Sequence, residues 1–292
     1  MEVREIEAKT LLATVRDPDG WFGVRYNMNL YRGCEHRCIY CDSRSECYQI
    51  ERFDEELLVK ANAVELLGRE LARKRIRGTV GTGAMTDPYT PSEARLRLTR
   101  QCLELISRAR FPVHLTTKSD MVLRDLDVLS AINRDGASVA FTLTTTDDSL
   151  ARKVEPRAPS PSARLRAMRA LADEGILVGV LMMPLLPFIQ DTRENVEAIV
   201  DRAKEAGATF IVPWYGMSLR DRQREHYYRH LDVHFPGLRA RYEARYGTRY
   251  GCQSPQARYL SHLFEERCAS LGLLTDPRQV AAHRRPKQLS LF

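Results

Sequence analysis

Short apolar runs alternate with longer helical patterns along most of this chain, and this alternation limits the fold more than any other feature. It is typical of parallel strands joined by crossover helices. Gly136, Gly175 and Gly207 each come just before a predicted strand, where helix-ending glycines are common. The predicted strands are Arg25–Leu30, Thr79–Gly83, Val113–Thr117, Ser138–Leu143, Leu177–Met182 and Phe210–Pro213. The predicted helices are Glu55–Arg75, Pro91–Arg108, Arg124–Asn133, Ser162–Glu174 and Arg193–Ala206.

Six strand–helix units favour an α/β fold with an open or partial (β/α)6 barrel over a complete eight-stranded one. The last predicted helix carries Val196, Ile199, Val200 and Ala203 at helical spacing, which gives one apolar stripe to lay on the sheet. After Gly216 the chain becomes rich in Arg, Tyr and His and loses its strand signals. We therefore expect an N-terminal arm over 1–20, the partial barrel over 21–216, a helical C-terminal appendage over 217–280 and an extended tail over 281–292.

The composition is that of a globular protein, with 43% hydrophobic and 28% charged residues in a chain of 292. The first residues, MEVREIEAKTLL, lack the apolar core of a signal peptide, and no run is long enough to span a bilayer. We expect a cytoplasmic protein with no membrane partner. The net charge of +7 is compatible with a nucleic-acid partner, and equally with a solvated arginine-rich surface.

Four of the seven cysteines fall within NLYRGCEHRCIYCDSRSEC, directly after the first predicted strand. Cys34, Cys38 and Cys41 form C-x3-C-x2-C at the carboxyl end of that strand, where α/β proteins gather functional groups. Three thiolates on one loop can ligate three irons of a 4Fe–4S cluster and leave the fourth iron open. The alternative metal is zinc, with Cys47 or His36 as a fourth ligand. Unligated buried thiols are the least favoured interpretation.

The cysteine motif, with Tyr40 before its third cysteine, resembles the radical S-adenosylmethionine (SAM, or AdoMet) superfamily. Further stretches are similar to its branch related to spore photoproduct lyase, often labelled DNA repair photolyase-like. They are GTGAMTDPYTPSE followed by LTR, TTKSDMVLRDLDVL, FTLTTTDD, VEPRAPSPSARLRAM and LMMPLLPFIQD. The resemblance runs from about Leu11 to Gly216 and implies a 4Fe–4S cluster at Cys34, Cys38 and Cys41 that binds AdoMet through its open iron. Reductive cleavage of AdoMet would then give a 5′-deoxyadenosyl radical that abstracts a substrate hydrogen.

The resemblance also implies which residues contact AdoMet. Lys118 and the Thr86 hydroxyl would contact its methionine or ribose part, Thr142 and Thr144 the ribose, and Arg157 the carboxylate. The backbone at Met183 and the side chain of Tyr40 would lie near the adenine. Taken singly, each residue also fits helix capping, strand packing or an exposed ion pair. The implied AdoMet residues are Tyr40, Thr86, Asp87, Lys118, Thr142, Thr144, Arg157 and Met183.

The chain departs from spore photoproduct lyase at two positions. The resemblance places a hydrogen-donating cysteine and a relay tyrosine where this sequence has Met85 and Asp42. A thioether has no S–H to give, and a carboxylate does not relay hydrogen atoms. Photoproduct reversal by that route is therefore in doubt. Cys47 and Cys252 are the remaining candidate donors or accessory ligands, with packing as the alternative for each.

The chain ends in QLSLF, which resembles the short peptide by which bacterial repair and replication proteins bind the DNA sliding clamp. A tail packed on its own domain is the alternative. We expect a radical AdoMet enzyme of DNA repair that receives its electron from flavodoxin or ferredoxin. The same chemistry on RNA or a peptide, and a zinc-stabilised, clamp-associated DNA-binding module, are the competing hypotheses. The predicted clamp-binding residues are Gln288, Leu289, Ser290, Leu291 and Phe292.

Overall fold

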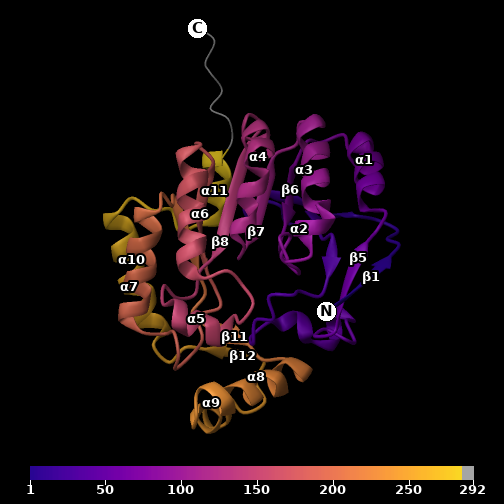
Figure 1. Cartoon of the computed structure of the whole chain (residues 1–292). Helices are drawn as coiled ribbons and strands as arrows, with labels where there is room; N and C mark the ends of the chain where they lie inside the picture. Colours follow the sequence, from indigo (N-terminus) through magenta and orange to yellow (C-terminus); the bar gives the residue numbers. More distant parts are fainter. Residues whose placement is uncertain (285–292) are drawn as a thin grey trace.

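A seven-stranded sheet forms the centre of the protein, for which a computed structural model describes residues 1–284. Its strands are β2 (Leu12–Thr14), β3 (Val24–Met28), β6 (Thr79–Thr82), β7 (Val113–Thr117), β8 (Ala137–Thr142), β9 (Leu177–Met182) and β10 (Phe210–Pro213). Their order is β10-β9-β8-β7-β6-β3-β2. Neighbours pair in parallel except β2, which runs antiparallel to β3. Because β10 and β2 are separate edges, the sheet is an open one (Figure 1).

The six parallel strands confirm the predicted α/β fold and its partial barrel. Helices between the strands cover the outer face of the sheet (Figure 1). The stripe predicted on the helix before β10 is confirmed, because all four of its residues are buried. The covering helices are α1 (Ala63–Arg73), α3 (Leu98–Arg108), α4 (Leu126–Asn133), α6 (Pro161–Asp173) and α7 (Arg193–Glu205), with the shorter α2 (Glu93–Leu96) and α5 (Asp148–Val154) in connecting segments.

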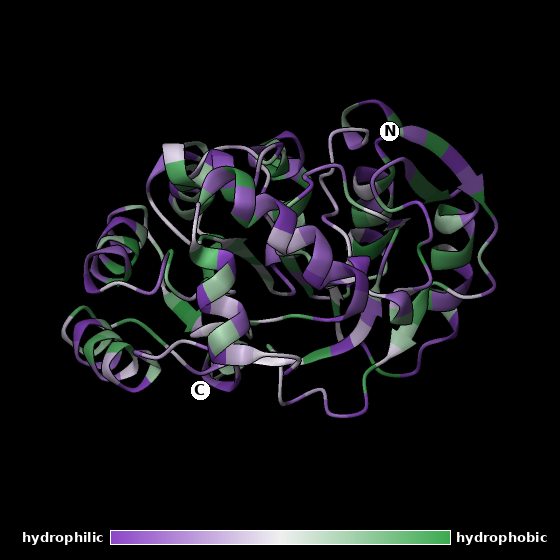
Figure 2. Ribbon diagram, turned by 90° about the horizontal axis from the view of Figure 1, so that it is seen from below, coloured by the Kyte–Doolittle hydropathy of each residue, from purple (hydrophilic) through white to green (hydrophobic). Residues whose placement is uncertain are grey.

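The two faces of the sheet differ because side chains alternate along each strand. On β7, Val113 and Leu115 pack in the core beneath the helices, whereas His114 and Thr116 point to the inner face and line a cavity. The helices carry hydrophilic and hydrophobic residues in alternation, as expected when one side of each rests on the sheet (Figure 2). The inner face is therefore left to hold a site.

The structure corrects the sequence prediction near the N-terminus. Residues 56–60 form strand β5 (Glu56–Lys60), where a helix was predicted over Glu55–Arg75. β5 pairs with β1 (Glu2–Ile6) and with β4 (Tyr31–Arg32), which buries Leu57 and Val59. Within the predicted N-terminal arm over 1–20, residues 2–6 and 12–14 are therefore strands of two sheets.

The first part of the appendage, over residues 216–253, packs at the end of the molecule where the carboxyl ends of the strands lie (Figure 1). It contains a short antiparallel pair that the sequence did not predict, β11 (Gly216–Ser218) and β12 (Gly251–Gln253). In the described residues, no helix has the length and apolar character needed to cross a bilayer. The helices of the appendage are α8 (Asp221–His234), α9 (Leu238–Tyr246) and α10 (Ala257–Ser270), followed by α11 (Pro277–Arg284).

Helix α11 lies near the opposite end of the molecule from α8 and α9 (Figure 1). It extends to Arg284, so residues 281–284 are helical where an extended tail was predicted. The clamp-like peptide Gln288–Phe292 lies outside the described residues.

Candidate functional site

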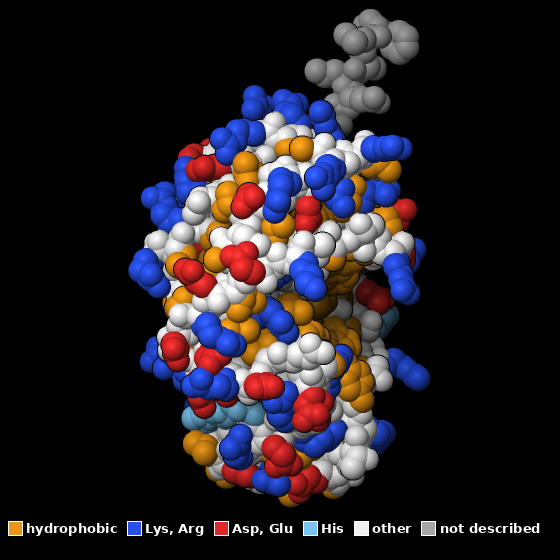
Figure 3. All heavy atoms as spheres, turned by 90° about the vertical axis from the view of Figure 1, so that its right-hand side faces the viewer, with side chains coloured by type: hydrophobic (Ala, Val, Ile, Leu, Met, Phe, Trp, Pro, Cys, Tyr) orange, Lys and Arg blue, Asp and Glu red, His pale blue; other side chains and the backbone are white. Residues whose placement is uncertain are grey.

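A cavity of about 460 Å³ lies on the inner face of the sheet. The cysteine loop, the segments that follow β6 and β9, and the inner residues of β7 and β8 form its wall. Loops at the carboxyl ends of parallel strands commonly build ligand sites. Figure 3 shows a hollow lined by hydrophobic side chains on this side of the molecule. Eight of the predicted site residues line the cavity: Cys34, Cys38, Tyr40, Cys41, Asp87, Lys118, Thr142 and Met183.

The three motif cysteines are free thiols that face this one space. Burial raises the pKa of Cys38 and of Cys41 above the usual range of a thiol. Burial acts in the same direction on Cys34, but the adjacent His36 outweighs it, so the pKa of Cys34 is lowered. One loop thus presents three sulfur ligands to the cavity.

A buried ion pair holds the cysteine loop in place. Arg164 donates to Glu155 Oε2 at 2.5 Å, and both side chains are 1% exposed. The Tyr40 hydroxyl donates to the other Glu155 oxygen, and the Ile39 amide donates to the Val154 carbonyl at 2.9 Å. Burial would raise the pKa of Glu155, but Arg164 and Lys118 lower it overall. The carboxylate therefore stays charged and fixes the residue that precedes Cys41.

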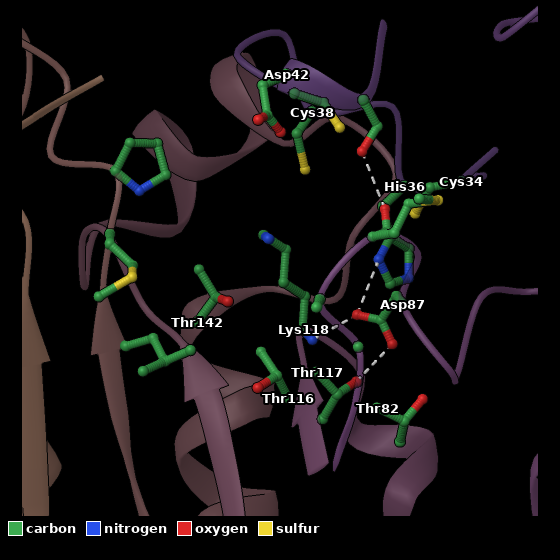
Figure 4. A pocket seen from close by; sticks show the side chains of 18 of the residues that line it. Cys34, His36, Cys38, Asp42, Thr82, Asp87, Thr116, Thr117, Lys118 and Thr142 are labelled. Carbon is green, nitrogen blue, oxygen red and sulfur yellow. Dashed lines mark hydrogen bonds and ion pairs between the residues drawn. The ribbon is translucent and has the colours of Figure 1, made fainter. Parts of the chain in front are cut away.

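Asp87, just after β6, joins three parts of the site (Figure 4). Its Oδ1 accepts from Thr117 Oγ1 at 2.7 Å and its Oδ2 from the Lys118 amide at 2.6 Å. His36 Nδ1 lies 3.4 Å from Oδ2. Burial would raise the pKa of Asp87, but His36 and these hydrogen bonds lower it to about 2. Asp87 thus ties the segment after β7 to the cysteine loop.

The Lys118 side chain extends into the cavity beside the cysteine loop (Figure 4). Its ammonium lies 5.8 Å from the centroid of the Tyr40 ring. Thr142, the last residue of β8, and Met183, which follows β9, line the same space. A cation and a hydroxyl near three thiols suit a ligand that has both a carboxylate and ribose hydroxyls.

Three predicted AdoMet residues do not line the cavity. The Thr86 hydroxyl is buried without a hydrogen-bond partner in the described structure. Thr144 Oγ1 accepts from Gln190 at 2.9 Å. Arg157 is exposed and lines a separate surface hollow. The two-residue period of the strand predicted that Thr142 and Thr144 would both face the cavity. This is correct for Thr142, but Thr144 lies beyond the end of β8, where the period no longer applies.

The two candidate thiol donors also lie outside the cavity. Cys47 is exposed, and Arg220 donates to its sulfur at 2.8 Å. Cys252 is buried in β12, within the hydrophobic core of the appendage. A hydrogen-atom donor must contact the substrate radical, so these positions argue against both. Met85 and Asp42, the two departures from the lyase pattern, do line the cavity.

Sequence reasoning missed several residues that shape the site. Arg164 was expected on an ordinary surface helix, yet it is buried against Glu155. Gln223 of α8 donates to the Tyr40 carbonyl at 2.7 Å, so the appendage supports the cysteine loop directly. The segment VEPRAPSPSAR offers one acid, Glu155, and two bases, Arg157 and Arg164, so the sequence indicated an ion pair here without deciding which arginine forms it.

The arrangement fits a cluster better than a single zinc ion. Cys47 faces Arg220 outside the cavity, so it does not join the three cysteines as a fourth ligand. His36 lies beside Cys34, but its Nδ1 is 3.4 Å from Asp87. Within residues 1–284, no three His, Cys, Asp or Glu side chains converge where one ion would bind. Zinc needs four ligands around one ion, whereas an iron–sulfur cluster takes each cysteine on a different iron. Three separated sulfurs match the second case.

Comparison with known proteins gives the family. The model of the Radical SAM superfamily matches residues 28–203, more than half of the chain. An uncharacterized protein of Mycobacterium tuberculosis is 33% identical over 229 residues, 76% of this chain and 67% of that protein. An uncharacterized protein of Methanocaldococcus jannaschii is 30% identical over 206 residues, 70% of this chain and 74% of that protein.

The fold is also similar to a solved structure, spore photoproduct lyase complexed with dinucleoside spore photoproduct. The TM-score is 0.70, with 14% identity over 94% of this chain and 81% of that chain. At this identity the likeness is one of fold. Together with the family match and the three-cysteine loop, it shows that the chain belongs to the radical SAM superfamily and is a radical AdoMet enzyme with a 4Fe–4S cluster and AdoMet as cofactors.

Proposed function

We propose that this enzyme abstracts hydrogen from a nucleic-acid substrate, and specifically from damaged DNA. The cavity carries the proposal, because its lining joins the cysteine loop and Lys118 to apolar side chains that include two partly exposed tryptophans, Trp21 and Trp214. A planar group bound there would lie in the same space as the cofactors. The net charge of +7 and the fold shared with a lyase whose complex holds a dinucleoside photoproduct support this substrate class.

Different residues of the cavity would bind the cluster and AdoMet. Cys34, Cys38 and Cys41 would each hold one iron. When bound, the cluster and AdoMet supply a 5′-deoxyadenosyl radical for hydrogen abstraction. Lys118 would neutralise the AdoMet carboxylate, and Thr142 would bind a ribose hydroxyl. Asp87 and Glu155 act as positioning residues, since they fix Lys118 and the cysteine loop.

The proposal does not extend to photoproduct reversal through a thiol. Among the described residues, the cysteines that line the cavity are the three of the motif. Met85 and Asp42 replace the donor and relay expected by resemblance and provide neither an S–H nor a phenol. Hydrogen abstraction from DNA is therefore proposed without assigning the lesion.

The test is deuterium transfer in the anaerobic, cluster-loaded enzyme. Reduced protein and AdoMet are incubated with deuterated DNA that carries defined lesions, and 5′-deoxyadenosine is analysed by mass spectrometry. We expect DNA to stimulate 5′-deoxyadenosine formation and one lesion to transfer deuterium into it. Stimulation by RNA or by a peptide, but not by any DNA, would show that the substrate class is wrong.

We further propose that a flavodoxin or ferredoxin supplies the electron and that Gln288–Phe292 binds the bacterial sliding clamp. The sequence of the tail supports the clamp proposal, because its last two residues are apolar and follow a basic, proline-containing segment. Removing the last five residues should abolish capture of the full-length enzyme by purified clamp without changing AdoMet cleavage. Capture that survives the deletion would contradict it.

A further inference from the structure

Two tryptophans from opposite sides of the open sheet line one cavity. Trp21 precedes β3, next to the β2 edge, and Trp214 follows β10 at the other edge. They are 39% and 45% exposed, although tryptophan is usually well buried. Partly exposed tryptophans at a cavity offer flat faces to a planar ligand.

An aromatic series leads from Trp21 into the interior. Trp21 meets Phe22 edge to face, with 4.9 Å between ring centroids. Phe22 stacks on His114, with centroids 4.1 Å apart and the rings 15° from parallel. His114 is 2% exposed and also lines the cavity. The cavity wall therefore continues from an exposed tryptophan to a buried imidazole.

The hydrogen bonds of His114 indicate its tautomer. Its Nδ1 lies 2.8 Å from Ser138 Oγ, and Arg284 donates to that same oxygen at 3.0 Å. Because Arg284 already donates to this oxygen, we assign the Ser138 proton to Nδ1, and this assignment puts the imidazole proton on Nε2. Burial and the charge of Arg284 hold the pKa of His114 well below its usual value, so the ring is neutral. Nε2 has no hydrogen-bond partner among the described residues.

His114 lies deeper in the sheet than the residues assigned to AdoMet. It precedes Lys118 by four residues on β7, which places it about 13 Å further along the strand. The surroundings at this depth are apolar, with Val15, Val24 and Leu181 in the cavity wall. A buried donor without a partner costs free energy that an acceptor on a bound ligand would recover.

We infer that this end of the cavity is a recognition subsite for a nucleobase, in which Trp21 stacks on the base and His114 donates from Nε2 to an acceptor on its edge. The inference rests on the proposed nucleic-acid function, and it adds the residues that would select the base. Stacking on aromatic side chains is a general way to hold an unpaired base. The hydrogen bond would distinguish a base from an apolar ring of the same shape.

The experiment measures binding of single-stranded oligothymidylate to the cluster-loaded enzyme with AdoMet, by fluorescence anisotropy under anaerobic conditions. A second oligonucleotide replaces one thymine by difluorotoluene, which keeps the shape and removes the acceptors. We expect the wild type to prefer thymine by roughly 2- to 10-fold. His114→Phe should lose this preference, and His114→Gln, which keeps an N–H donor, should restore part of it.

Trp21→Ala should weaken binding of both oligonucleotides roughly 5-fold or more. Tyr259→Ala is the matched control, because Tyr259 is 49% exposed on α10 and does not line the cavity. An unchanged thymine preference in His114→Phe, or a Trp21→Ala variant that binds like the control, would overturn the subsite. Oligonucleotides that bind in the expected pattern but never stimulate AdoMet cleavage would leave the subsite standing and refute DNA as the reaction substrate.

Discussion

At the residue scale, the site depends on charges buried in pairs. The Glu155–Arg164 pair is fully enclosed and also receives the Tyr40 hydroxyl, so it links α6 to the cysteine loop. Removing one member leaves the other charge buried without compensation. The same pair therefore serves both stability and the geometry of the cluster loop.

Glu155→Gln should lower the free energy of unfolding by about 3–5 kcal/mol, because Arg164 would stay buried and charged. Urea unfolding of the cluster-loaded protein measures this. The control is Glu197→Gln in the exposed Arg193–Glu197 pair, which should cost at most about 0.5 kcal/mol. Equal effects of the two substitutions would contradict the role of the buried pair.

The cysteines should divide into two groups by iron content. Cys34→Ala, Cys38→Ala and Cys41→Ala should each lose the cluster and AdoMet cleavage, since each thiol would hold a separate iron. Cys47→Ser and Cys252→Ser should keep both, because neither side chain lines the cavity. Iron and sulfide analysis after anaerobic reconstitution measures this. Loss of iron in Cys47→Ser would contradict the prediction and support Cys47 as a fourth ligand.

At the element scale, helix α8 is the part of the appendage that touches the cluster loop. Besides Gln223, it carries His226, whose side chain is 14% exposed and lies 4.0 Å from Asp54. Burial, followed by the charge of Arg44, lowers the pKa of His226 to about 4. Asp54 acts to raise this pKa, whereas His230 and Arg229 lower it further. The folded protein therefore prefers a neutral His226.

This preference predicts a loss of stability in mild acid. In the unfolded chain His226 takes up a proton below about pH 6.5, whereas in the folded chain it does so only near pH 4. The free energy of unfolding therefore falls as the pH is lowered from 6.5 to 4, by at most about 3 kcal/mol. His226→Phe should remove this part of the pH dependence in urea unfolding between pH 7 and pH 5. His262→Gln, on the exposed side of α10, should leave it unchanged. Identical pH profiles for wild type and His226→Phe would refute the assignment.

The elements that were predictable from sequence differ physically from those that were not. The six parallel strands carry short apolar runs, and β8, β9 and β10 each follow a glycine that ends the preceding helix. Their pairing follows from chain order. β5 was missed because ELLVK runs without a break into the helical pattern of α1. β11 and β12 are only three residues long and lie 32 residues apart in the chain, so no local period marks them.

The part of the site that lies on one loop could be predicted from the sequence. The part that depends on the curvature of the sheet could not. The cysteine spacing alone located Cys34, Cys38 and Cys41 in one cavity. Trp21 and Trp214 meet the same cavity only because the sheet curls, which sequence patterns do not encode. Arg157 was misplaced because its segment turns outward after α5.

At the scale of the whole molecule, positive charge gathers at the end opposite the cysteine loop. Arg73, Arg75 and Arg77 are exposed just before β6, and Arg134 is exposed just before β8. Lysine and arginine side chains crowd this end in Figure 3. Helix α11 also ends here, since Gly136 before β8 packs against Arg284. Under the proposed function, we expect this end to contact the phosphate backbone of DNA.

Changing Arg73, Arg75 and Arg77 together to Gln should weaken binding to undamaged duplex DNA and flatten its salt dependence. Each lost phosphate contact lowers the slope of log affinity against log salt by about 0.9. The control changes Arg169, Arg193 and Arg202, which are exposed but paired with carboxylates on covering helices. A slope that is unchanged in the first variant, or equally reduced in both, would contradict a dedicated contact surface.

The edges at β10 and β2 do not pair with each other, and the C-terminal part of the described chain lies between them. Leu274 hydrogen-bonds to Thr209 and Ile211 along the β10 edge. Helix α11 follows, where Val280 packs with Phe22 and Phe210 and Arg284 donates to the Phe22 carbonyl at 2.8 Å. A truncation before Leu274 would therefore remove the segment that joins the first parallel strand of the sheet to the last.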